Sequence, residues 1–326
     1  MITEEEIKKS RRSLNRLINE IEGVIVGHKR IIEMSIITLL SRGNILLEGV
    51  PGLGKTLLVR ATASALDLKF SRIQFTPDLM PADITGTNIL KEENGERKFS
   101  FSPGPIFANL ILADEINRAT PKTQSALLEA MEEETVTVGN ETHFLNRPFI
   151  VMATQNPIEM EGTYPLPESQ IDRFSFKVDL AYPDRAELTE ITNRNTENGG
   201  ISLPEPVSSG EEIILSQKIV DELPVPEELK KFTSKLVLAT DPQNKSAPEN
   251  IREYVDYGSS PRGSLALIRG AKARAFLKGE YNVSKHDIER VYKPAIRHRL
   301  ILNFKAESEG VDVEELLDEV WKSTEV

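Results

Sequence analysis

The sequence contains no cysteine, which excludes disulfides, thiolate metal sites and a cysteine nucleophile. Histidine is scarce as well, and the four histidines are scattered without the spacing of a metal site. No apolar run can cross a bilayer, because the longest, at residues 31–40, is short and is interrupted by Glu33. Positive charge is not in excess either. The 40 basic and 51 acidic residues leave a net charge of −11, which opposes non-specific binding to nucleic acid or to an anionic membrane.

The composition is that of a folded globular protein. With 28% charged and 39% hydrophobic residues, the 326-residue chain can bury a substantial core, and its length favours two domains. Residues 1–12 are charged and lack the apolar core of a signal peptide. We therefore expect a cytoplasmic protein without direct membrane insertion.

The most informative stretch lies at residues 44–59, where an apolar strand-like run enters a glycine-rich turn and leaves as an amphipathic helix. The turn reads G-x-x-x-x-G-K-T, the pattern of a phosphate-binding loop. Lys55 would add a charge at the β- and γ-phosphates, and the Thr56 hydroxyl would bind Mg²⁺. A turn that carries Lys-Thr by chance is the alternative, but the flanking strand and helix oppose it. The predicted nucleotide contacts here are Gly49, Pro51, Gly52, Leu53, Gly54, Lys55, Thr56 and Leu57.

A short apolar turn at residues 24–27 separates two predicted helices, at 4–22 and 29–42. It is either a packed connector or part of a pocket for the base, to which Val26 and Gly27 would contribute. The sequence alone leaves both interpretations open.

Polar side chains follow two further apolar strands, predicted at residues 110–115 and 149–154. The first strand ends in Asp114 and Glu115, and Asn156 follows the second. Ligands collect at the carboxyl ends of parallel strands, so Asp114 is expected to hold Mg²⁺ and Glu115 to polarise the attacking water. Asn156 can orient that water, with an ordinary Asn-Pro turn as the alternative.

Two arginines lie far from the loop in sequence. Arg173, before a strand-like run at 174–178, is either a surface charge or a finger that reaches a phosphate in a neighbouring subunit. Arg262 stands at the start of a predicted helix at 264–278, where dipole arguments disfavour a cation. We therefore expect Arg262 to meet an anion, for which the nucleotide is the obvious candidate.

Hairpins and a change in composition complete the organisation of the chain. Hairpins are predicted at residues 86–105, turning at Asn94 and Gly95, and at 134–146. Residues 196–212 are rich in Gly, Pro, Ser and Glu and predict a linker. Helices are expected beyond it at about 217–222, 226–239, 264–278, 284–298 and 313–323. The predicted division is a nucleotide-binding domain at 1–198, a linker at 199–223 and a helical domain at 224–326.

In combination, the stretches at residues 49–56, 104–107, 112–119, 153–157 and 166–174 resemble those of AAA+ ATPases, and more narrowly of the MoxR family. The resemblance implies an α/β P-loop core with a parallel five-stranded sheet between helices, two inserted β-hairpins and a C-terminal all-helical lid domain. It assigns Walker A to residues 49–56 and Walker B to Asp114 and Glu115. It also implies sensor 1 at Asn156, an arginine finger at Arg173 and sensor 2 at Arg262, acting in cis or in trans. Arg118 is a second candidate for an inter-subunit contact.

The function implied by this resemblance is Mg²⁺-dependent ATP hydrolysis in a ring, expected to be a hexamer. The ring would remodel or mature client proteins, with a von Willebrand factor A domain protein as partner. Magnesium-chelatase subunits share the two inserted hairpins and give one alternative function. A nucleotide-switched assembly module is the other. The absence of a Gly-Ala-Phe-Thr-Gly-Ala loop argues against a transcription activator, and the absence of a basic domain argues against a nucleic-acid motor.

Overall fold

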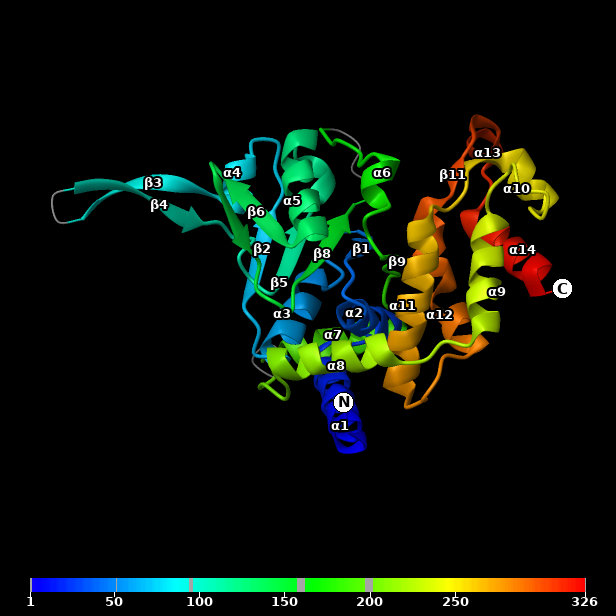
Figure 1. Cartoon of the computed structure of the whole chain (residues 1–326), viewed down its shortest axis with the longest axis horizontal. Helices are drawn as coiled ribbons and strands as arrows, with labels where there is room; N and C mark the ends of the chain where they lie inside the picture. The colour runs from blue at the N-terminus through cyan, green and yellow to red at the C-terminus, as the bar shows by residue number, and fades with distance from the viewer. Residues whose placement is uncertain (1, 51, 94–95, 157–161, 197–201, 326) are drawn as a thin grey trace.

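The computed structural model describes residues 2–50, 52–93, 96–156, 162–196 and 202–325 (Figure 1). Its centre is a five-stranded sheet in the order β2-β5-β8-β1-β9, and every neighbouring pair of strands is parallel. The apolar runs of β5 and β8 are buried, as expected of strands covered on both faces. The predicted α/β class with a parallel five-stranded sheet is therefore confirmed. The strands are β1 (Ile45–Glu48), β2 (Phe70–Gln74), β5 (Leu110–Asp114), β8 (Ile150–Gln155) and β9 (Phe176–Asp179).

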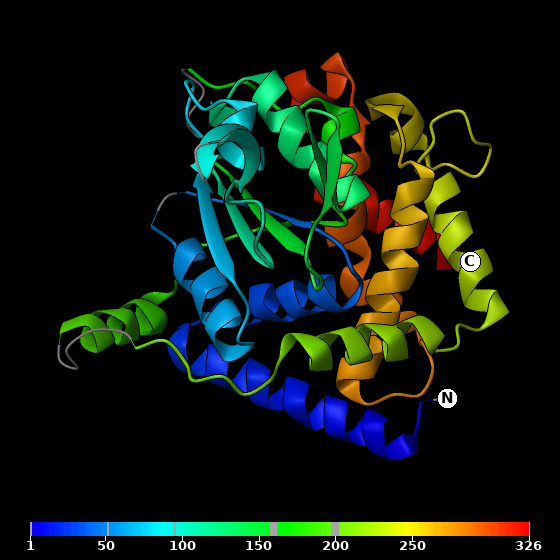
Figure 2. The ribbon, with the colours of Figure 1, turned by 60° about the vertical axis from the view of Figure 1, so that its left-hand side comes forward.

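Helices cover both faces of the sheet (Figures 1 and 2). Because strand side chains alternate between faces, Leu47 joins the core formed with α1, α2 and α3, whereas Leu46 joins the core under α5. α1 begins at a capping box in which Thr3 and Glu6 satisfy each other's backbone N–H groups. The elements of this half are α1 (Glu4–Val24), α2 (Lys29–Leu40), α3 (Lys55–Ala65), α4 (Pro81–Thr85), η1 (Ile116–Arg118), α5 (Pro121–Glu133), α6 (Glu168–Ile171) and α7 (Arg185–Thr196).

Both predicted hairpins are present. The first, β3 (Gly86–Glu93) with β4 (Glu96–Pro103), extends away from the sheet in Figure 1, and its predicted turn residues Asn94 and Gly95 lie outside the described residues. The second joins β6 (Thr135–Val138) to β7 (Glu141–Phe144). Phe101 of β4 stacks on His143 of β7 with ring centroids 3.9 Å apart, so the hairpins contact each other.

The C-terminal part is mainly helical, with one correction to the all-helical prediction. Two short antiparallel strands, β10 (Val255–Tyr257) and β11 (Ile301–Leu302), pair between its helices. These strands are too short to give a periodic signal in the sequence, and their pairing depends on the tertiary fold. The helices are α9 (Glu227–Leu238), α10 (Glu249–Tyr254), α11 (Pro261–Lys278), α12 (Lys285–Ile296), η2 (Arg297–Arg299), α13 (Phe304–Glu309) and α14 (Val313–Glu325).

The segment predicted as a linker contains a packed helix, α8 (Gly210–Glu222), which begins well before the expected residue 217. Ser209 caps it, and its Ile213 and Val220 are buried in the core shared with α1 and α2. The Gln217 side chain donates to the carbonyl oxygen of Leu39 at 2.7 Å. The beginning of this helix was not predicted, because the polar residues around it have the composition of a loop. The proposed domain boundaries remain a prediction.

α11 lies directly against the edge strand of the sheet. A Cβ at Gly270 would come within 2.7 Å of the Phe176 ring, so glycine allows this close approach. The contact brings the beginning of α11 to the end of the sheet where the strands start. No helix in the described part of the chain is long and apolar enough to cross a membrane.

Candidate active site

The phosphate loop connects β1 to α3. Gly52 and Gly54 have φ angles of 86° and 80°, in the left-handed region that residues with a Cβ rarely adopt. Nothing lies within 4 Å of a Cβ built on either, so the backbone conformation, and not a lack of space, favours glycine. Gly54 precedes α3 and has no side chain to accept from the first N–H groups, which leaves them free for an anion. Pro51, among the predicted contacts, lies outside the described residues.

Lys55, the first residue of α3, directs its ammonium group into the loop. Its Nζ donates to the carbonyl oxygen of Gly49 at 2.6 Å. Burial lowers the pKa of Lys55, and the nearby Asp114 and Glu115 carboxylates oppose that shift. The ammonium is therefore held against the loop, where it can bind a phosphate.

Thr154 connects the two predicted catalytic carboxylates at the end of β5. Its hydroxyl donates to Asp114 Oδ1 at 2.6 Å and accepts from the Glu115 N–H at 2.8 Å. Glu115 has a φ of 56°, a left-handed conformation that costs a non-glycine residue about 1–2 kcal/mol. The bond that the Glu115 N–H donates to Thr154 helps to hold that conformation and so fixes where the Glu115 side chain points.

Three further side chains contact these carboxylates. The Gln74 amide donates to Glu115 Oε2 at 2.7 Å, and Arg118 donates to the same oxygen at 3.1 Å. Arg72 bonds Asp114 Oδ2 at 2.6 Å. Arg118, a candidate for an inter-subunit contact, thus pairs with a carboxylate of its own subunit.

Asn156 lies between the carboxylates and the phosphate loop. It directly follows β8, the strand between β5 and β1, and is only 5% exposed. The neighbouring Gln155 carbonyl accepts from the Gly49 N–H at 3.2 Å. The polar strand ends singled out from the sequence are therefore brought together at one edge of the sheet.

The residues suited to hold Mg²⁺ are Thr56, second in α3, and Asp114. Both offer the hard oxygen ligands that this ion prefers, and nucleotide-bound Mg²⁺ takes only one or two protein ligands besides phosphates and water. Within the described ranges no cluster of three or more His, Cys, Asp or Glu residues forms a separate metal site. The donor set fits a metal that arrives with a nucleotide.

An apolar cavity of about 320 Å³ opens beside the phosphate loop. Val26, a candidate base-pocket residue, lines it, and the adjacent Gly27 has a φ of 69°. A Cβ at Gly27 would lie 2.4 Å from Glu187 Oε1, so this turn is packed closely against α7. The residues lining the cavity include Val24, Val26, Leu53, Leu57, Tyr182, Leu188 and Asn195. The last three were not anticipated, because the helix that carries Leu188 and Asn195 was not predicted.

Arg173 lies at the opposite end of the sheet. It precedes β9, where the Ser175 N–H donates to the carbonyl oxygen of Asn44, the residue before β1. β1 has four residues, and a rise of about 3.3 Å per residue separates its two ends by about 13 Å. The loop follows one end of β1, and Arg173 lies near the other.

Arg262 lies beside Arg173 and not beside the phosphate loop. Its guanidinium pairs with Glu132 and lies 3.7 Å from Asp172 Oδ2. Arg262 was expected to contact an anion, and in this structure the anions are carboxylates of its own chain. Both oxygens of Asp172 also accept from the Ser260 hydroxyl, at 2.8 and 2.9 Å.

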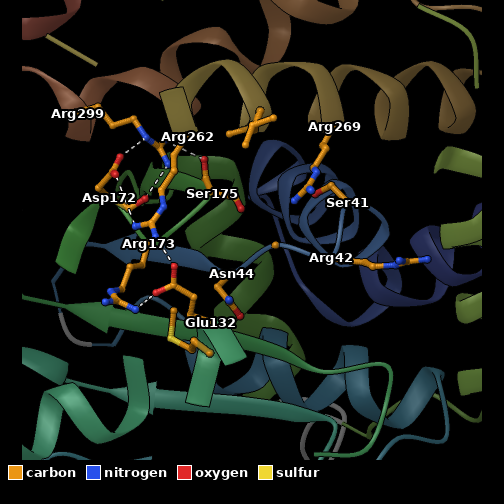
Figure 3. Close-up of a pocket in the computed structure, with 14 residues that line it drawn as sticks. Ser41, Arg42, Asn44, Glu132, Asp172, Arg173, Ser175, Arg262, Arg269 and Arg299 are labelled. Atoms are coloured by element: carbon orange, nitrogen blue, oxygen red, sulfur yellow. Dashed lines mark hydrogen bonds and ion pairs between the residues drawn. The ribbon is translucent and has the colours of Figure 1, made fainter. Parts of the chain in front are cut away.

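A cavity of about 200 Å³ lies between the start of α11, the end of α5 and this edge of the sheet (Figure 3). Arg299 is buried in its wall and donates to Asp172 Oδ1 at 2.8 Å. Burial lowers the pKa of Arg299, and Asp172 opposes that shift. The charged lining residues are Arg42, Glu132, Asp172, Arg173, Arg262, Arg269 and Arg299, so positive charge prevails in a chain that is acidic overall.

Comparisons with known proteins agree with this geometry. Residues 44–176 match the family model "ATPase family associated with various cellular activities (AAA)", and residues 248–320 match the AAA lid domain. The chain is 42% identical to the uncharacterized protein YeaC of Bacillus subtilis, over 96% of this chain and 94% of that one. It is 41% identical to Chaperone MoxR1 of Mycobacterium tuberculosis, over 95% of this chain and 81% of that one.

A crystal structure from Cytophaga hutchinsonii superposes with a TM-score of 0.92 at 41% identity, covering 98% of this chain and 96% of the other. Protein MoxR of Methylorubrum extorquens is 30% identical, over 88% of this chain and 87% of its own length. These matches span both the sheet with its phosphate loop and the helical C-terminal part. The chain belongs to the MoxR family of AAA ATPases.

Proposed function

We propose that this protein is a Mg²⁺-dependent ATP hydrolase whose active site is shared between two copies of the chain. The observation that carries the proposal is the division of the charged groups. Lys55, Glu115 and Asn156 gather at one edge of the sheet, and the arginines Arg173 and Arg262 lie at the other. The arginines therefore complete the site of a neighbour.

Within one subunit, each group has a role that its surroundings support. The loop N–H groups and Lys55 bind the phosphates, and the cavity that Val26 lines accepts the base. Glu115, oriented by Gln74, accepts a proton from the attacking water, which Asn156 helps to orient. Thr56 and Asp114 would hold Mg²⁺, which would supply positive charge to neutralise the phosphates.

Between subunits, Arg173 acts as a finger, since a planar guanidinium stabilises the charge that develops on the transferred phosphoryl group. Arg262 acts from the same side, so sensor 2 works in trans. The repeated head-to-tail contact closes into a ring, for which the family resemblance implies six subunits.

The work of the ring is proposed to be remodelling or maturation of client proteins, with a von Willebrand factor A domain protein as partner. Two observations support a protein client. MoxR1, named a chaperone, is similar over most of both chains. The hairpins also expose the apolar side chains Leu90, Phe99 and Phe144, which could contact another polypeptide.

A dilution experiment tests the shared site. ATP turnover per subunit should follow the oligomeric fraction measured by sedimentation at the same concentrations, because Arg173 and Arg262 of a lone subunit lie at the other end of the sheet from its own phosphate loop. A monomeric species that hydrolyses ATP at the full rate would contradict the proposal.

Lys55→Ala tests the phosphate loop itself. Loss of one charge-assisted contact, worth up to about 3 kcal/mol, should weaken ATP binding about 100-fold. Titration with a fluorescent ATP analogue measures the effect. Lys230→Ala is the control, since Lys230 is exposed and pairs with Glu227 on α9, far from the loop in sequence. Equal affinities of the two variants would exclude the assigned role.

A further inference from the structure

Glu132 has a carboxylate that is divided between two arginines. It lies in the last turn of α5, where Oε2 pairs with Arg173 and Oε1 pairs with Arg262 (Figure 3). Arg173 comes from the loop before β9 and Arg262 from the start of α11. One side chain thus joins two cationic groups supplied by separate parts of the fold.

The two guanidinium groups need an anion between them, because like charges at close range repel. Asp172 is less able to serve, since both of its oxygens accept from Ser260 and one also accepts from Arg299. Asp172 Oδ2 lies 3.7 Å from Arg262 Nη1. Of the described carboxylates near this edge, Glu132 is the one that contacts both arginines.

The position of Glu132 is fixed by the rest of α5. Leu127, Leu128 and Met131 are buried in the core under the sheet, whereas the Glu132 side chain is 36% exposed. At the other end of the helix, the Gln124 amide donates to the carbonyl oxygen of Ile116 at 3.2 Å. α5 is therefore held at both ends, and Glu132 is presented from a rigid element.

We propose that Glu132 is a positioning residue that holds Arg173 and Arg262 side by side, oriented for the phosphates bound by the neighbouring subunit. This inference rests on the proposed shared site. Glu132 itself touches no nucleotide, and its effect on turnover is transmitted through the two arginines.

Substitutions at Glu132 separate positioning from packing. Glu132→Gln keeps the size of the side chain but leaves a single acceptor oxygen, so it can serve only one arginine. Glu132→Asp keeps both oxygens and the charge on a shorter arm. Glu133→Gln is the matched control, because Glu133 is the exposed neighbour on the same turn.

Glu132→Gln should lower kcat about tenfold, since misplaced catalytic groups lose rate steeply. The affinity of its own phosphate loop for a fluorescent ATP analogue should not change. Glu132→Asp should recover part of the lost rate, and Glu133→Gln should match the wild type. In an Arg173→Ala, Arg262→Ala background, Glu132→Gln should cause no further loss, because the groups through which it acts are gone.

Mixed oligomers locate the defect. Glu132→Gln subunits mixed with Glu115→Gln subunits should regain turnover, because some interfaces then pair an intact Glu115 with intact arginine positioning. Unchanged kcat in Glu132→Gln, a further loss in the arginine-free background, or weakened nucleotide binding would each overturn the inference. Normal turnover in Arg173→Ala would contradict the shared active site itself. Normal turnover in Glu132→Gln, with Arg173→Ala impaired, would contradict only the positioning role of Glu132.

Discussion

Glu115→Gln is expected to bind ATP with unchanged affinity and to hydrolyse it about 10²- to 10⁴-fold more slowly, the range for loss of a general base. The substitution is nearly isosteric, and the new amide oxygen can still accept from Gln74, which donates to Glu115 at 2.7 Å. The backbone N–H of residue 115 donates to the Thr154 hydroxyl, and this bond does not involve the side chain of residue 115. What disappears is the carboxylate that accepts a proton from water.

The measurement compares kcat with a directly determined ATP affinity. Glu134→Gln serves as the control. Glu134 forms an ion pair with Arg147, with 2.6 Å between Glu134 Oε2 and Arg147 Nε, and not with the candidate catalytic residues. Unimpaired turnover in Glu115→Gln would refute the role of this carboxylate. Loss of ATP binding would show that the substitution disturbs the phosphate loop.

Arg173→Ala is expected to lower kcat by about 10³-fold, within the range for a transition-state arginine. ATP affinity of the variant's own loop should persist, because about 13 Å of strand separates Arg173 from it. Arg262→Ala should lower kcat about tenfold. Since Glu132 pairs with both arginines, the two losses should not be additive.

Arg147→Ala is the matched control for both arginine variants, because Arg147 forms an exposed pair with Glu134 just beyond α5. Full activity of Arg173→Ala would identify this side chain as a surface charge. A large loss of ATP affinity in the isolated variant would instead indicate that Arg173 reaches its own nucleotide.

The strand ends that carry the candidate catalytic residues could be predicted from the sequence because their signals are local. Gly52, Gly54 and Lys55 occur within one short turn, Asp114 directly follows an apolar run, and Asn156 lies three residues beyond another that ends at Ala153. A buried parallel strand is recognisable by its continuous apolar run, and its carboxyl end is where ligands collect. The same local signals predicted the five strands and both hairpins.

The groups that orient these residues were not predicted, because their roles depend on which strands are neighbours. Thr154 and Gln74 become informative only once β5 is known to lie between β2 and β8. In the parallel register Gln74 pairs with Asp114, which brings its side chain to Glu115. Sequence periodicity reports burial and does not report strand order.

The arginine side of the site depends still more on tertiary structure. Arg173 was proposed from the sequence, but its partner Glu132 lies on a different element and belongs to no motif. The close approach of α11 to β9 at Gly270 brings Arg262 to the same edge. Nothing in the order of residues along the chain indicated that one carboxylate would join the two arginines.

The central claim, that one active site is built from two subunits, is tested most directly by mixing two inactive variants. Glu115→Gln subunits lack the base but retain Arg173, and Arg173→Ala subunits retain the base but lack the finger. At equal ratio, interfaces that join an intact Glu115 to an intact Arg173 should restore turnover well above that of either variant alone. No restoration at any ratio, in oligomers verified to contain both variants, would contradict a shared site.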